Sequence, residues 1–122
     1  MYAIRGATTA ATDTEKDIRK SVENLMKYIF NKNNLETDDI ISIIFSSTHD
    51  LTAIYPARIF REMGYDDIPL FSCMEPPIQG SLNLCIRVLI HIRGNKADSN
   101  KVKHVYKNEA KKLRPDLLDS GE

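Results

Sequence analysis

The sequence contains few of the residues that mark common functional classes. It has only two cysteines, Cys73 and Cys85, and no tryptophan. Two thiols at this spacing match neither a zinc motif nor a redox motif, and the N-terminal residues lack an apolar stretch of the signal-peptide type. We therefore expect a reduced, cytoplasmic setting. No run approaches the ~18 apolar residues of a membrane span, so we expect no membrane association.

Neither sign of charge is in excess, since lysine plus arginine and aspartate plus glutamate both number 17. A nucleic-acid-binding surface needs a basic footprint, so we expect no nucleic-acid partner. The basic segment 101–114 contains one aromatic residue, Tyr106, and this favours a solvated surface over a polyanion site. The histidines lie far apart in the sequence, and we expect neither a metal site nor a cofactor; they are His49, His91 and His104.

Common catalytic motifs are also missing. The sequence has no G-x-S-x-G, no P-loop, no G-x-G-x-x-G and no H-E-x-x-H. What remains is a set of charged or phenolic side chains in apolar neighbourhoods, namely Arg5, Glu75, Arg87 and Tyr106. These four side chains are the first candidates for a functional site.

The most regular pattern in the sequence predicts one long amphipathic helix over about residues 14–30. Its start is marked by two alternative capping boxes, Thr12 with Glu15 or Thr14 with Asp17. Apolar residues then recur at steps of three and four, as expected for one buried helical face: Ile18, Val22, Leu25, Met26, Ile29 and Phe30.

The rest of the chain predicts a mixed sheet and one short helix. Pro56 is suited to the first position of this helix and Gly64 to its end, and Arg58 and Arg61 would project from the same side of it. The run IISIIFS is continuous and β-branched, which predicts a strand buried on both faces. Strands are predicted at residues 2–7, 40–46, 68–73 and 85–92, whereas 101–113 is ambiguous between strand and helical turn.

Together these elements predict an α+β fold, with a mixed sheet and one long helix across a face. With 122 residues we expect a single domain over residues 1–122, ending in a flexible tail at about 115–122. A chain of this size has difficulty enclosing a large cavity alone, which favours oligomerisation.

Arg87 interrupts the strand CIRVLIHI in its middle. A guanidinium cannot lose its proton on burial, so Arg87 must either reach solvent or meet an anion. Because side chains alternate along a strand, the even-numbered residues from Ile86 to Ile92 form a core face. The opposite face, which carries Arg87, is mixed and suits a cleft wall or a subunit interface. From the pattern alone, Arg87 can equally well pair with Glu75 and simply tie two segments together.

Several motifs of the chain resemble the AroH-type monofunctional chorismate mutases along nearly the whole length. They are IRGATT at 4–9, YPARIFR at 55–61, the ExxxxGSLxxCIRV pattern at 75–88, HVY at 104–106 and LRPDL at 113–117. The resemblance implies a homotrimer whose three sheets form a central pseudo-α/β-barrel, with active sites in clefts between subunits. It also implies an isomerase of the shikimate pathway, which converts chorismate to prephenate for phenylalanine and tyrosine biosynthesis.

The implied reaction is pericyclic and needs no nucleophile, proton shuttle, metal or cofactor. By this resemblance Arg87 donates to the breaking ether oxygen, and Arg5 and Tyr106 hold the side-chain carboxylate of chorismate. Glu75 accepts a hydrogen bond from the ring hydroxyl and places Arg87. Further substrate-binding positions carried over by matching are Tyr55, Ala57, Arg58, Arg61, Phe71, Ser72, Cys73, Leu113 and Arg114.

One position departs from the family pattern. The family has a cysteine three residues before the glutamate, where this chain has Ser72, with Cys73 one step later. Strand alternation sends these two side chains to opposite faces, and we favour Ser72 toward the site because a hydroxyl makes a similar hydrogen bond. A β-bulge would exchange them.

Three other interpretations compete with this one. The first is a trimeric protein that processes imines or enamines at inter-subunit sites. The second is a metabolite-binding module without catalysis. In the third, the four unusual side chains are interstrand pairs only, and substituting Arg5, Glu75 or Arg87 would unfold the chain.

Overall fold

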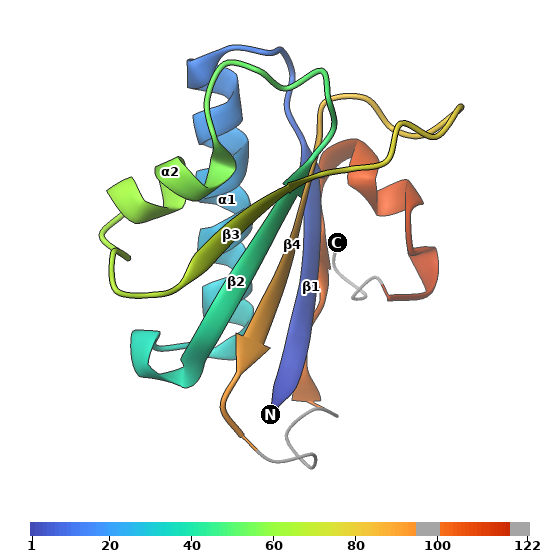
Figure 1. Cartoon of the computed structure of the whole chain (residues 1–122). Helices are drawn as coiled ribbons and strands as arrows, with labels where there is room; N and C mark the ends of the chain where they lie inside the picture. Colours follow the sequence, from blue (N-terminus) through green and yellow to red (C-terminus); the bar gives the residue numbers. More distant parts are fainter. Residues whose placement is uncertain (95–100, 118–122) are drawn as a thin grey trace.

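Five strands of the described residues form one mixed sheet (Figure 1), in the order β3-β2-β4-β1-β5. The computed structural model describes residues 1–94 and 101–117. β4 is antiparallel to both of its neighbours, whereas the edge strands β3 and β5 run parallel to β2 and β1. This confirms the predicted α+β arrangement. The strands are β1 (Tyr2–Thr9), β2 (Ile40–Ser47), β3 (Leu70–Met74), β4 (Cys85–Ile92) and β5 (Val105–Tyr106).

The long helix α1 (Glu15–Asn33) begins and ends at recognisable caps. The Thr14 hydroxyl accepts a hydrogen bond from the Asp17 backbone N–H at 3.2 Å, which confirms the second of the two predicted caps. Asn34 ends the helix in the left-handed conformation, with φ 51°. None of the described helices is long and apolar enough to cross a membrane.

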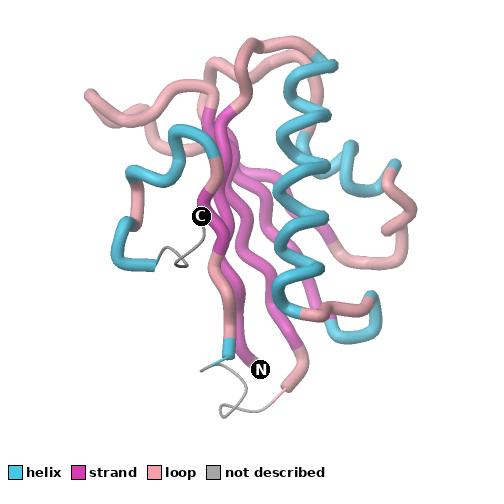
Figure 2. Tube along the Cα trace, turned by 180° about the vertical axis from the view of Figure 1, so that it is seen from behind, coloured by secondary structure: helices cyan, strands magenta, loops and turns pink. Residues whose placement is uncertain are grey.

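The short helix α2 (Pro56–Glu62) has Pro56 at its first position, as predicted, and Gly64 follows its end with φ +105°. α1 and α2 cover the same face of the sheet (Figure 1). Seen from behind, α1 runs along the sheet on one side and the C-terminal turns lie beyond its far side (Figure 2). The remaining described turns are the 3-10 helices η1 (Thr37–Asp39), η3 (Asn108–Lys112) and η4 (Pro115–Leu117).

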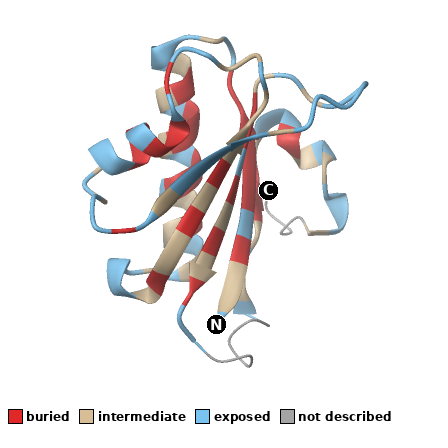
Figure 3. Ribbon diagram, in the orientation of Figure 1, coloured by how far each residue is buried: buried red, intermediate tan, exposed pale blue. Residues whose placement is uncertain are grey.

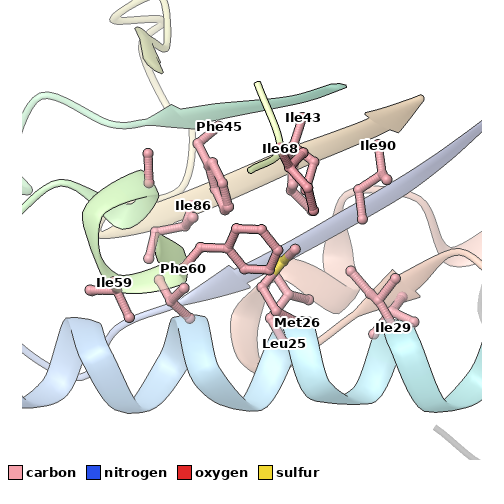
Figure 4. Packing of buried hydrophobic residues seen from close by; sticks show 14 of the residues in the cluster. Leu25, Met26, Ile29, Ile43, Phe45, Ile59, Phe60, Ile68, Ile86 and Ile90 are labelled. Carbon is pink, nitrogen blue, oxygen red and sulfur yellow. The ribbon is translucent and has the colours of Figure 1, made fainter. Parts of the chain in front are cut away.

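The hydrophobic core fills the space between the helices and the sheet (Figure 4). The Phe60 ring from α2 lies between α1 and the strands, with its centroid 5.9 Å from that of Phe45 on β2. On its other side Phe60 stacks on Tyr65 at 4.6 Å. The predicted apolar face of α1 is buried, with Leu25, Met26 and Ile29 fully inaccessible to solvent.

Gly6 allows α1 to approach β1 closely. A Cβ atom at this position would lie 2.6 Å from Ile29 Cδ1 and 2.9 Å from Val88 Cγ1. Contacts this short would force the side chains of Ile29 and Val88 to move within a packed core. The glycine of IRGATT is therefore needed for packing, and it keeps the helix against the strand that carries Arg5.

The second sheet face is open in the single chain, and this corrects the prediction for β2. Along this strand Ile40, Ile43 and Phe45 are buried, but Ile41 and Ile44 are only partly covered. Buried and accessible positions alternate along β2 and β4, whereas β3 is exposed along most of its length (Figure 3). A continuous apolar run predicts two covered faces, but the helices of one chain cover only one of them.

The structure assigns the ambiguous C-terminal segment, whereas the flexible tail stays a prediction. The ambiguous segment 101–113 contains the two-residue strand β5, followed by the helical turns of η3. Residues 115–117 of the predicted loose tail form η4, and residues 118–122 lie outside the described residues.

Candidate active site

Arg5 and Arg87 lie on the open face of adjacent strands. Arg87 is opposite Ala7 on β1 and Ser46 on β2, and Arg5 is opposite Leu89. Arg5 and Arg87 are thus diagonal neighbours, a relation in which residues typically lie about 7–8 Å apart. The small side chains of Ala7 and Ser46 leave room on both sides of the Arg87 guanidinium. Two long cationic side chains can therefore reach one ligand here.

Arg87 both reaches solvent and has an anionic partner. The two alternatives that the sequence left open for this mid-strand arginine are therefore both realised. Its Nε lies 3.3 Å from Glu75 Oε1, and the exposed fractions of the two side chains are 49% and 19%. Ion pairs this accessible contribute only about 0–1 kcal/mol to stability. The pair is consequently better suited to orient the Arg87 guanidinium than to hold the fold together.

The loop between Glu75 and Arg87 is fixed at both ends. At its start the Glu75 backbone N–H donates to Ser47 O at 2.9 Å. At its end the Asp50 carboxylate accepts the backbone N–H of Leu84, which has φ 51°. Non-glycine residues rarely adopt this left-handed conformation, so the hydrogen bonds to Asp50 offset its cost. The Thr48 hydroxyl accepts the Cys85 N–H at 2.9 Å, and these contacts fix the start of β4 two residues before Arg87.

Tyr106 lies on β5 beside Ala7 and is almost completely buried, with 5% of its surface exposed. Burial raises the pKa of its phenol, and the positive charges of Arg5, Arg114 and Arg87 offset part of this effect. The phenol therefore keeps its proton near neutral pH and can donate a hydrogen bond.

Arg114 follows η3 and pairs with Asp116 through two hydrogen bonds, of 3.0 and 2.8 Å. These bonds raise the pKa of Arg114 and lower that of Asp116. The described C-terminal turn thus presents a guanidinium beside Tyr106 and Arg5.

These side chains surround a cavity of about 310 Å³, which we call the arginine cavity. Positive charge dominates it, because three arginines and a single carboxylate line it. Ser46 and Ile44 also contribute to the lining, and the sequence did not indicate them, since a strand expected to be buried on both faces offers no open wall. Six of the predicted site residues meet here: Arg5, Glu75, Arg87, Tyr106, Leu113 and Arg114.

A second cavity of about 580 Å³ lies between α2, β3 and the loop that precedes α2; we call it the tyrosine cavity. Four predicted site residues line it, namely Tyr55, Arg58, Ser72 and Cys73. Arg58 Nε pairs with Glu62 Oε1 at 3.0 Å, and Glu62 also contacts Arg19 at 2.7 Å. The single chain therefore separates the predicted site into two groups of residues.

Three of the predicted positions line neither of these cavities. Ala57 is buried in the core beneath α2, where its side chain packs instead of facing a ligand. Arg61 is exposed on the same helix, and Phe71 on β3 is 66% exposed. The structure therefore places Phe71 and Arg61 on the surface, where only another molecule can cover them.

The register of β3 places Ser72 and Cys73 on opposite faces of the sheet. Cys73 is opposite Ser46, which is itself opposite Arg87, so Cys73 shares the open face with Arg87. Ser72 is opposite Phe45 and shares the core face. No bulge interrupts this pairing. Both side chains nevertheless line the tyrosine cavity, so the preference for Ser72 toward the site stays a prediction.

Within residues 1–94 and 101–117, no group of three or more His, Cys, Asp or Glu side chains is arranged to hold a metal ion. The arrangement can instead bind an anion: forked guanidinium donors and a phenol surround one small cavity on a rigid sheet. Fold and site together define an α+β protein with a cationic pocket on one face of its sheet.

Comparisons with known proteins identify the family. Residues 1–117 match the model of the family described as chorismate mutase type I. The chain is 35% identical to chorismate mutase AroH of Bacillus subtilis (strain 168), covering 96% of this chain and 92% of the relative. It is 37% identical to chorismate mutase AroH of Thermus thermophilus, covering 96% of each. The chain belongs to the chorismate mutase type I family.

A solved structure agrees with this assignment. A chorismate mutase from Clostridium thermocellum superimposes with a TM-score of 0.87 at 46% sequence identity. The match covers 93% of this chain and all of the other. The resemblance inferred from the motifs is thereby confirmed at the level of the family.

Proposed function

We propose that this chain catalyses the rearrangement of chorismate to prephenate, and that the arginine cavity holds the reacting molecule. The observation that carries the proposal is the convergence of Arg5, Arg87 and Arg114 on one cavity in a member of this family. Chorismate carries two carboxylates, and guanidinium forks bind carboxylates in a defined geometry. Binding in this way would select the compact conformer in which the reacting carbons are close together.

Arg87 supplies the electrostatic part of the mechanism. As the ether bond breaks, negative charge builds on its oxygen, and a fixed donor stabilises that charge more than it stabilises the ground state. The contact between Glu75 and Arg87 Nε holds the guanidinium in place before the substrate arrives. Glu75 also accepts from the ring hydroxyl of chorismate, while Arg5 and Tyr106 hold the side-chain carboxylate. Leu113 and Arg114 close the mouth of the cavity.

The active unit in this proposal is a homotrimer. The open sheet face and the exposed Tyr55, Phe71 and Met74 would be covered by neighbouring protomers. The tyrosine cavity of one protomer would then face the arginine cavity of the next and supply the second wall of each site. This explains why one chain carries the predicted site residues in two separate groups.

A chorismate-consumption assay on the purified full chain tests the function. We expect the wild-type protein to remove the absorbance of chorismate and Arg87→Ala to remove almost none of it. Lys16→Ala is the matched control, because it deletes one exposed positive charge from α1, on the covered side of the sheet. Binding of chorismate without turnover by the wild-type protein would favour a non-catalytic module and contradict the proposal.

Subunit complementation tests the shared site. Arg87→Ala inactivates the arginine cavity, and Arg58→Ala removes a predicted substrate-binding cation from the tyrosine cavity alone. After equal amounts of the two variants are unfolded and refolded together, about a quarter of all sites in the resulting trimers would combine two intact walls. We expect the activity of the mixture to exceed that of either variant alone. We also expect the assembled protein to have three times the mass of the 13.9 kDa chain. A mixture no more active than its components would mean that each site lies within one chain.

A further inference from the structure

We propose that His104 is a positioning residue that fixes Arg5 in the arginine cavity through the backbone of β1. The inference rests on the proposed function for the role of Arg5 and concerns a residue that does not line the cavity itself. The Arg5 backbone N–H donates to His104 Nδ1 at 3.0 Å, across 99 positions of the sequence.

The imidazole takes the place of a missing backbone partner. The ladder between β1 and β5 consists of two residue pairs, Gly6 with Val105 and Ala7 with Tyr106. Arg5 comes one residue before this ladder on β1, and His104 comes one residue before it on the β5 side. The imidazole accepts the N–H there, so the ring extends the ladder by one hydrogen bond and ties down the residue that carries the guanidinium.

Only the neutral ring can make this contact. A backbone N–H is always a donor, so Nδ1 must be unprotonated and the ring proton must be on Nε2. Partial burial lowers the pKa of His104, and the nearby positive charges of Arg5 on β1 and Arg114 after η3 lower it further. The neighbours of His104 thus favour the form that holds Arg5, and protonation would both remove the acceptor and add a third positive charge.

Pairing with β4 holds the backbone of Arg5 on one side, and His104 completes the other side. Within the part of the chain that the structure describes, its guanidinium makes no ion pair with a carboxylate, in contrast to Arg87 and Arg114. The place of this side chain therefore depends on its backbone. Residues that bind a carboxylate by direct contact lose affinity when they shift by a fraction of an ångström, so loosening Arg5 should affect KM more than kcat.

Two substitutions at this position separate the hydrogen bond from the packing of the ring. His104→Leu introduces a side chain of similar size without ring nitrogens, which leaves the Arg5 N–H without an acceptor. We expect KM for chorismate to rise about tenfold with little change in kcat. His104→Asn offers an amide oxygen near the position of Nδ1 and should keep KM within about twofold of the wild-type value.

Asn33→Ala is the matched control for a general loosening of the segment. Asn33 on α1 exchanges two hydrogen bonds with the backbone of Lys103, the residue before His104, at 2.8 and 3.0 Å. Its removal should lower Tm without raising KM, because the acceptor for Arg5 remains. An equal rise in KM for Asn33→Ala and His104→Leu would mean that His104 only stabilises the segment, and would overturn the proposal.

The pH profile and a double mutant provide further tests. The kcat/KM of the wild-type protein should fall as pH decreases through the pKa of His104, which is lowered below the usual 6.5, while His104→Asn should show no such fall. In an Arg5→Ala background, His104→Leu should raise KM no further. A fall that persists in His104→Asn, or a full additional loss in the Arg5→Ala background, would refute the role.

One measurement is independent of activity. The backbone amide resonance of Arg5, followed by nuclear magnetic resonance, should titrate with the His104 ring in the wild-type protein and stay constant in His104→Asn. An inactive wild-type protein with this titration would refute the proposed function alone. An active protein without it would refute the positioning role alone.

Discussion

Arg87 and Ile90 lie three residues apart on β4 but on opposite faces of the sheet, and their surroundings differ completely. Ile90 is fully buried against α1, whereas Arg87 is half exposed and pairs with Glu75. The covered face has fixed packing and no charge, and the open face has charge and free space. Stability is thus concentrated on one side of the sheet and binding on the other, so substitutions on the two faces should affect different measurements.

The largest effect is expected on the open face. Arg87→Lys keeps the positive charge but replaces a fork with a single ammonium, which cannot serve Glu75 and an ether oxygen together. We expect kcat to fall by the equivalent of about 3–4 kcal/mol of barrier, with little change in Tm. Steady-state kinetics and a thermal melt of the same preparation measure both. Near-normal turnover would exclude the assigned role.

The next effect is expected on the covered face. Ile90→Ala removes a fully buried side chain and leaves a cavity, which should cost about 2–5 kcal/mol of unfolding free energy. Leu89→Ala is the matched control, because its side chain is partly exposed on the other face and should cost about 1 kcal/mol of chain stability. Urea unfolding followed by circular dichroism compares them. Equal losses would mean that the two faces are equally packed.

Gly6→Ala tests the junction between the two faces. The added methyl group would lie 2.6 Å from Ile29 Cδ1, so either the Ile29 side chain turns aside or α1 shifts away from β1. Overpacking of this kind costs about 1–3 kcal/mol. Because β1 also carries Arg5, we expect KM for chorismate to rise together with the loss of stability. A variant with normal Tm would show that Ile29 can turn aside without cost.

The smallest effect is a pH dependence of stability. Because the pKa of His104 is lowered in the folded chain, the unfolded chain takes up the proton first as pH falls below 6.5. The stability contributed by neutral His104 is therefore complete above this pH and is lost as pH falls through the lowered pKa. Between about pH 7.5 and about pH 5, Tm should decrease more for the wild-type protein than for His104→Asn. Parallel Tm curves for the two proteins would contradict this.

The sequence predicted those features that are repeated along an element. The spacing of Ile18, Val22 and Leu25 identified the buried face of α1, and alternation on β4 separated Arg87 from the core. The same logic failed for β2, because apolar side chains do not reveal whether their own chain or another one covers them. Ile44 belongs to a run that predicted two buried faces, yet it borders an open cavity.

Features that depend on a distant segment could not be predicted in this way. The sheet faces that Ser72 and Cys73 take are set by pairing with β2, and the contact of His104 with Arg5 joins opposite ends of the chain. The motifs of the family did predict that Arg5, Glu75, Arg87 and Tyr106 belong together. A family motif contains information about a shared pocket, whereas the local spacing of residues does not.

The hydrogen bonds of Asp50 and Thr48 at the end of the loop have a practical consequence for redesign. They anchor Leu84 and Cys85 whatever the path of the preceding residues, and the bond from Glu75 to Ser47 anchors the other end. Residues 76–79 between these anchors can therefore be exchanged or lengthened, at a loop-closure cost that grows only slowly with length, whereas Leu82 packs against the cluster of Ala7, Tyr106 and Ala110 and must be kept. The segment is a natural place to graft new recognition elements beside the pocket.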